Sequence, residues 1–174
     1  MAKTSQAATN ALKVTPALQN EFAQLTYHYA AGADLAGAGD HQGSVNEFRK
    51  AFADDAVSEY VFPPNWSHLN TTVKGGGAGL AQFATDFVNA FGLVRLQHMI
   101  TNVVVTRTGP TTAVMRSYAL AIHVYPDEHV FNATVKYLDD VRLINGQWKF
   151  VHRVVTLTSM WEAPTWTGAP PPPR

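Results

Sequence analysis

The sequence predicts an α+β fold: a cone-shaped α+β barrel in which three N-terminal helices pack on a curved, mostly antiparallel sheet. Apolar residues recur at helical spacing in three segments before residue 92, and four long strand-like segments then follow with no helix between them. The length of 174 residues suits one domain. We therefore expect a domain over residues 15–160, a flexible N-terminal arm at 1–14 and a Trp/Pro-rich tail at 161–174.

The first helix is expected to begin at Thr15 and Pro16, because a hydroxyl at the N-cap and a proline in the first turn favour a helix start. Its apolar stripe consists of Leu18, Phe22, Leu25 and Tyr29. The Gly/Ala-rich stretch 32–39 predicts that this helix frays or ends near Gly32.

Two further helices are predicted before the long strands. One begins near Ser44 and turns Val45, Phe48 and Phe52 inward. The other begins near Gly79, and its apolar stripe consists of Leu80, Phe83, Phe87 and Phe91. Between them we expect a strand at 57–62 and a loop at 63–78. Gly75–Gly77 in this loop lack the Lys and Ser/Thr of a phosphate-binding loop, so they predict a flexible lid or a turn.

The second half of the chain is predicted to form consecutive antiparallel strands. Their expected ranges are 95–107, 112–125, 130–144 and 147–159. Asn145-Gly146 is a strong signal for a two-residue hairpin between the last two strands. Helices first and a meander of strands afterwards favour a sheet whose concave face is covered by the helices.

Four short motifs carry a resemblance to a known family. They are Tyr29 with Asp34 five residues later, the run Phe52-Ala53-Asp54-Asp55-Ala56-Val57, the run His98-Met99-Ile100-Thr101-Asn102-Val103, and the run Asn145-Gly146-Gln147-Trp148-Lys149-Phe150 with Arg153. In this order, over residues 20–158, they resemble the SnoaL-like branch of the nuclear-transport-factor-2-like (NTF2-like) superfamily. The resemblance implies a small-molecule pocket inside a curved sheet. The Gly/Ala stretch at 35–39 and the tail depart from the family pattern.

His98 is the first candidate for catalysis. It alternates with Leu96 and Ile100 on one face of its strand, and from the residues alone such a histidine is more often part of a core. The resemblance to dehydratases of the scytalone and bile-acid type implies instead that His98 is a general acid/base and that Asp34 orients it. It also implies that Tyr29 donates its hydroxyl to a substrate carbonyl, although a tyrosine on an apolar helix stripe is usually a core residue.

Seven further residues are candidates for substrate binding. Three are polar residues in otherwise apolar strands: Asn102, Arg153 and Arg116. Four are aromatic residues: Tyr60, Tyr118, Trp66 and Phe87. The aromatic residues favour a flat, apolar, aromatic or polycyclic small molecule as the substrate.

The amino-acid composition excludes several classes of partner and cofactor. Lys plus Arg and Asp plus Glu both number 13, so nothing resembles the basic surface of a nucleic-acid-binding or membrane-binding protein. The chain has no cysteine, and its seven histidines lack zinc-site spacing, so we expect no metal and no cofactor. The low share of charged residues and the net charge of zero favour self-association, and we expect a homodimer or homotrimer that binds a small-molecule substrate. No signal peptide is visible, which leads us to expect a cytoplasmic protein.

Three functions remain open at this point. The first is a cofactor-independent lyase, of the dehydratase or retro-aldol type, that uses His98 and Asp34 for acid/base catalysis. The second is an isomerase or cyclase, comparable to ketosteroid isomerase or the polyketide cyclases, that returns the proton to the substrate. The third is a non-catalytic module that binds a small molecule or dimerises as an accessory subunit. This fold hosts all three classes, so the fold alone does not choose between them.

Overall fold

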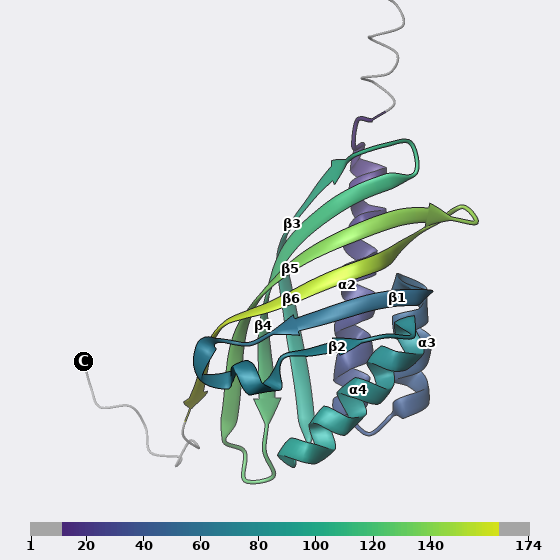
Figure 1. Ribbon diagram of the computed structural model, residues 1–174. Helices are drawn as coiled ribbons and strands as arrows, with labels where there is room; N and C mark the ends of the chain where they lie inside the picture. The colour runs from purple at the N-terminus through teal and green to yellow at the C-terminus, as the bar shows by residue number, and fades with distance from the viewer. Residues whose placement is uncertain (1–11, 164–174) are drawn as a thin grey trace, which may run out of the picture.

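The computed structural model describes residues 12–163, so most of the predicted N-terminal arm and C-terminal tail lies outside the described residues. The helices are α2 (Pro16–Gly37), α3 (His41–Ala51), the short 3-10 helix η1 (Pro64–Leu69) and α4 (Gly76–Phe91). The strands are β1 (Phe52–Val61), β2 (Thr71–Val73), β3 (Arg95–Arg107), β4 (Thr112–Val124), β5 (Val130–Ile144) and β6 (Gln147–Ala163) (Figure 1). Within residues 12–163, no helix is both long and apolar enough to cross a membrane.

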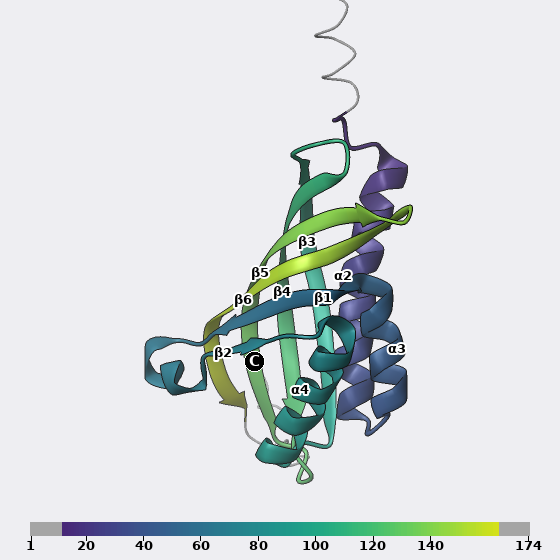
Figure 2. The ribbon, with the colours of Figure 1, turned by 45° about the vertical axis from the view of Figure 1, so that its right-hand side comes forward.

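The six strands form one open, curved sheet in the order β2-β1-β6-β5-β4-β3. Strands β1 and β6 pair in parallel, and every other neighbouring pair is antiparallel. Figure 2 shows α2, α3 and α4 on one side of this sheet, with the strands curving around them. The predicted α+β architecture is confirmed, and the sheet remains open at its β2 and β3 edges.

Helix α2 continues through the Gly/Ala-rich stretch, so the prediction that it ends near Gly32 was wrong. Thr15 caps the helix, and its hydroxyl accepts a hydrogen bond from the Leu18 backbone N–H at 3.2 Å. A Cβ on Gly32 would lie 2.9 Å from the Phe48 ring, and one on Gly37 would lie 2.6 Å from the Leu96 backbone nitrogen. The small residues therefore allow α3 and β3 to approach α2 closely, and this packing outweighs the low helix propensity of glycine.

Helix α3 begins earlier than the prediction of Ser44. Asp40 occupies its N-cap, where the carboxylate accepts a hydrogen bond from the Gly43 backbone N–H at 2.8 Å. The helix passes directly into β1 at Phe52, so the strand begins five residues before the predicted residue 57. The pairing of β1 with β6 shifts register between Phe52 and Val57, which hides the usual strand alternation there.

The Gly75–Gly77 run is a turn and helix start, the second of the two predicted alternatives. Gly75 and Gly76 have φ angles of 86° and 53°, which favour glycine. A Cβ on Gly76 would lie 2.0 Å from the carbonyl oxygen of Ala53. Glycine is therefore required where the start of α4 crosses β1, and α4 begins three residues before the predicted Gly79.

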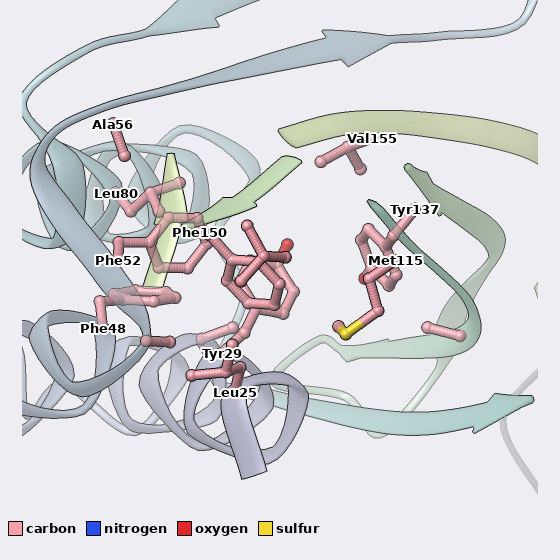
Figure 3. Close-up of a cluster of buried hydrophobic side chains, with 14 of the residues drawn as sticks. Leu25, Tyr29, Phe48, Phe52, Ala56, Leu80, Met115, Tyr137, Phe150 and Val155 are labelled. Carbon is pink, nitrogen blue, oxygen red and sulfur yellow. The ribbon is translucent and has the colours of Figure 1, made fainter. Parts of the chain in front are cut away.

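The core lies between the helices and the concave face of the sheet. Figure 3 shows Tyr29 reaching from α2 toward Phe52, Phe150 and Tyr137, among the other side chains of this cluster. The rings of Phe52 and Phe150 lie 5.0 Å apart, and those of Tyr29 and Tyr137 lie 5.3 Å apart. The predicted Asn145-Gly146 hairpin is also present, with positive φ at both residues. Of these core residues, Tyr29 and Tyr137 also line the cavity between the helices and the sheet.

Candidate active site

A cavity of ≈ 380 Å³ opens between the three helices and the concave face of the sheet. Its wall is mainly apolar and aromatic. The aromatic lining residues are Tyr29, Phe48, Tyr60, Phe62, Trp66, Phe83, Phe87, Phe91, Tyr125, Phe131, Tyr137 and Trp161. Within residues 12–163, the polar groups of the wall are few: tyrosine hydroxyls, the indole N–H groups of Trp66 and Trp161, two histidines and one carboxylate. This combination is typical of a small-molecule site.

His98 and Asp34 form a close pair at this cavity. The ring Nδ1 of His98 lies 2.8 Å from Oδ1 of Asp34, and the His98 backbone N–H donates to Oδ2 at 3.3 Å. The His98 side chain is 9% exposed and lines the cavity, whereas Asp34 lies behind it and is 33% exposed. An ionised carboxylate only accepts hydrogen bonds, so Nδ1 carries the proton and Nε2 is left as the nitrogen available for proton transfer.

The backbone explains how residues 64 positions apart in sequence come together. Gly37 packs against Leu96, two residues before His98, and so brings α2 close to β3. Asp34 lies one helical turn before Gly37, and both of its carboxylate oxygens then reach His98. The close packing of α2 on β3 thus positions the pair.

A second histidine, His123, lies in the same cavity and was missed by sequence reasoning. Its ring centroid is 6.4 Å from that of His98. Its Nδ1 lies 3.0 Å from the carbonyl oxygen of Phe131, which fixes Nδ1 as the protonated nitrogen of the neutral ring. Burial, and secondly the proximity of His98, lower the pKa of His123 to about 4, so it is neutral at physiological pH.

The alternation of residues along β4 could have predicted that His123 faces the cavity. It follows Ala119 and Ala121 at two-residue spacing on β4, and all three are buried on the cavity side. In the β3–β4 ladder, His98 pairs with Ala121 and Leu96 pairs with His123, which makes the two histidines diagonal neighbours.

Tyrosine hydroxyls provide hydrogen-bond donors inside the cavity. The hydroxyl oxygens of Tyr29 and Tyr60 are 3.5 Å apart. Burial raises the pKa of Tyr60 and of Tyr137 well above the ordinary value for tyrosine, and the neighbouring Tyr29 raises both further. The Tyr60 and Tyr137 hydroxyls therefore stay protonated and can donate to a substrate oxygen.

Arg153 and Asp139 form a fully buried ion pair beneath these tyrosines. Nε and Nη2 of Arg153 donate to the two carboxylate oxygens of Asp139 at 2.6 and 3.0 Å. The guanidinium carbon lies 4.2 Å from the ring centroid of Tyr29 and 4.5 Å from that of Tyr137. The charge of Arg153 is thus held against aromatic faces and a carboxylate, and Arg153 does not line the cavity.

The structure brings together six of the ten sequence-predicted site residues. Those that line the cavity are Tyr29, Tyr60, Trp66, Phe87 and His98, with Asp34 directly behind His98. Four predicted substrate-binding residues do not line it: Asn102, Arg116, Tyr118 and Arg153. These four side chains lie outside the wall of this cavity, and their role in substrate binding stays a prediction.

The physical reasons differ among these four residues. Asn102 has a φ of 54° at a bulge in β3, and it is exposed. Arg116 and Tyr118 project from the outer face of β4, since Met115, Ser117 and Ala119 take the inward positions. Arg153 does point inward but is bound to Asp139, as described above. Among residues 12–163, no three His, Cys, Asp or Glu side chains group closely enough to hold a metal ion.

The sequence matches the model of a known protein family. The model of the SnoaL-like domain matches residues 18–154, which is most of the sequence. The chain belongs to the SnoaL-like domain family. This family is part of the NTF2-like superfamily, in agreement with the sheet and helix arrangement. No curated protein matches the sequence significantly.

Solved structures share the same fold at low sequence identity. A proposed aromatic ring hydroxylase from Novosphingobium aromaticivorans has a TM-score of 0.65 and 22% identity, covering 83% of this chain and 92% of that one. A proposed scytalone dehydratase from the same organism has a TM-score of 0.59 and 19% identity, covering 100% and 99%. A hexachlorocyclohexane dehydrochlorinase from Novosphingobium barchaimii has a TM-score of 0.62 and 16% identity, covering 97% and 96%. At these identities the likeness establishes the fold alone.

Proposed function

We propose that this SnoaL-like protein is a cofactor-independent lyase that acts on an apolar, aromatic or polycyclic small molecule. His98 transfers the protons, and Asp34 holds its ring in the required orientation. The observation that carries this proposal is the 2.8 Å contact between Asp34 and His98 Nδ1 at the wall of an aromatic cavity. An imidazole so oriented can accept and return a proton near neutral pH, and the carboxylate stabilises its charged form.

In the dehydratase version, His98 Nε2 removes a proton from the carbon next to a substrate carbonyl. The C–H electron pair forms a carbon–carbon double bond with the carbonyl carbon as the carbonyl π electrons move onto the oxygen, and the Tyr29 and Tyr60 hydroxyls donate hydrogen bonds to the resulting enolate oxygen. The enolate electrons then form the carbon–carbon double bond and expel hydroxide from the adjacent carbon. The hydroxide takes the proton from the His98 imidazolium and leaves as water.

In the retro-aldol version, His98 removes a proton from a substrate hydroxyl. The oxygen electrons form a carbonyl, and the neighbouring carbon–carbon bond breaks. Its electron pair becomes an enolate, which takes the proton back from His98. Two of the similar structures carry the names of eliminating enzymes, a dehydratase and a dehydrochlorinase, and this favours elimination.

An isomerase is the second candidate because the cavity holds a second imidazole, that of His123. His123 could help return the proton at another position, its ring centroid being 6.4 Å from that of His98. The product of an isomerase keeps the mass of the substrate, whereas the product of a lyase is lighter. Mass spectrometry of products from hydroxylated aromatic ketones therefore separates the two, and binding without turnover indicates the accessory module.

The proton-transfer step can be tested before the natural substrate is known. 1-Tetralone is a neutral bicyclic ketone with exchangeable protons next to its carbonyl, so NMR in D₂O measures their replacement by deuterium. We expect the wild type to accelerate this exchange and His98→Ala to lose about 10²–10⁴-fold of the acceleration. His152→Ala is the control, since His152 binds Glu59 and lies outside the cavity wall. Equal rates in the wild type and His98→Ala would contradict the proposal.

A further inference from the structure

The cavity offers almost no positive charge to a ligand. Among the described residues, its wall contains no Lys or Arg side chain, and its one carboxylate is Glu162 near the end of β6. His123 is neutral at physiological pH, for the reasons given above. His98 is paired with Asp34, so the pair adds no net positive charge even when the imidazole is protonated. The described wall is therefore neutral to negative.

The negative charge of an anionic ligand would meet few compensating groups in this cavity. Bringing a carboxylate or phosphate out of water is strongly unfavourable unless a cation or several hydrogen-bond donors replace the solvent. The guanidinium of Arg153 is already bound to Asp139 and lies behind the tyrosine rings. The tyrosine hydroxyls and histidines that remain suit neutral oxygen atoms, such as carbonyl and hydroxyl groups.

Glu162 adds a direct electrostatic barrier at the mouth of the cavity. It pairs with Phe131 in the β5–β6 ladder, and both residues line the cavity. Glu162 is itself exposed, whereas Phe131 is partly buried, so the carboxylate borders the opening. A carboxylate at an opening with apolar walls repels anions as they approach.

We infer that this cavity takes ligands without a negative charge, and that Glu162 is a specificity-determining residue at its entrance. The substrate class is a neutral aromatic or polycyclic compound bearing carbonyl or hydroxyl groups, and carboxylates and phosphate esters are excluded. This inference rests on the proposed function only in taking the same cavity as the substrate site. It makes no use of the chemistry of His98.

Two probes of equal shape test this inference by calorimetric titration of the full chain near neutral pH. 2-Naphthamide is neutral, and 2-naphthoate carries a carboxylate at the same position. We expect the wild type to bind naphthoate at least about tenfold more weakly than naphthamide. In Glu162→Gln, naphthoate binding should tighten by roughly threefold to tenfold, while naphthamide binding is unchanged. Glu21→Gln, which removes an exposed carboxylate from α2, should leave both affinities at their wild-type values.

Three results would overturn the inference. The first is naphthoate binding as tightly as naphthamide, and the second is no binding of either probe. The third is an affinity ratio in Glu162→Gln equal to that of the wild type. Failure of the lyase proposal is distinguishable from all three, because selective binding of naphthamide would then persist without any exchange of 1-tetralone protons.

Discussion

The protonation of His123 should make the stability of the protein depend on pH. Its pKa falls from the ordinary 6.5 to about 4 in the folded state, first because of burial and then because of His98. The unfolded chain therefore binds more protons than the folded chain between these two values, and stability is full above pH 6.5 and declines toward pH 4. The decline from this one residue is of the order of 3 kcal/mol.

Denaturant unfolding of the wild type and His123→Gln over this range measures that contribution. The free energy of unfolding of the wild type should fall more steeply with decreasing pH than that of His123→Gln, because glutamine does not titrate. Parallel pH profiles would show that the imidazole is not buried in its neutral form.

The buried ion pair of Arg153 and Asp139 should contribute strongly to the stability of the fold. Asp139→Asn would leave a guanidinium charge with no exposed surface and no carboxylate, so we expect a loss of about 3–5 kcal/mol in the free energy of unfolding. The neighbouring Asp140 is 61% exposed, so Asp140→Asn should change the free energy of unfolding by less than about 0.5 kcal/mol. Similar losses in the two variants would contradict the assignment of the pair.

At the scale of elements, the contact between α2 and β3 supports the candidate site. A Cβ on Gly37 would lie 2.6 Å from a backbone nitrogen of β3, which cannot move aside as a side chain can. Gly37→Ala should therefore push α2 away from β3, lengthen the Asp34–His98 contact and destabilise the fold by about 1–2 kcal/mol, even after the gain in helix propensity. The exchange assay and a thermal melt should both record the loss. A fully active and equally stable Gly37→Ala protein would show that this packing does not position the pair.

The elements also show what sequence patterns predict and where they fail. The ranges of β3 and β4 follow their alternation, and Asn145-Gly146 marks its hairpin, because these signals are local. The extension of α2 to Gly37 depends on Phe48 and Leu96, which are distant in sequence. The bulge at Asn102 interrupts an alternation that otherwise predicts an inward side chain.

The candidate site follows the same division between local and long-range information. The pairing of His98 with Asp34 was predictable through the family motifs. The pairing of Arg153 with Asp139 was not predictable from the sequence. Both side chains point inward, and only the packed core decides which partners meet.

At the scale of the whole molecule, the outer face of the sheet is the surface best suited to a second copy of the chain. Its exposed large apolar residues are Val61, Met99, Val104, Tyr118 and Leu138. Arg116 and Lys136 lie on the same face as Asp140 and Glu59, so two copies can match opposite charges, and the net charge of zero does not oppose association. We propose a homodimer or homotrimer formed through this face.

Light scattering after size exclusion tests this assembly. We expect a mass of two or three times 19.0 kDa for the wild type and a smaller mass for Leu138→Lys, with unchanged circular dichroism. Tyr27→Lys is the control, because it alters an exposed aromatic residue on α2 instead. A monomeric wild type, or an assembly that Leu138→Lys leaves intact, would contradict the proposed interface.

The most direct test of the central claim is long-range ¹H–¹⁵N NMR of the His98 ring in the wild type and in Asp34→Ala. The spectra are recorded at about pH 9, where an ordinary imidazole is neutral. If Asp34 holds His98 for catalysis, the wild-type ring is a single tautomer protonated at Nδ1, and that preference is lost in Asp34→Ala. A wild-type ring protonated at Nε2, or one that Asp34→Ala leaves unchanged, would contradict the proposed catalytic pair.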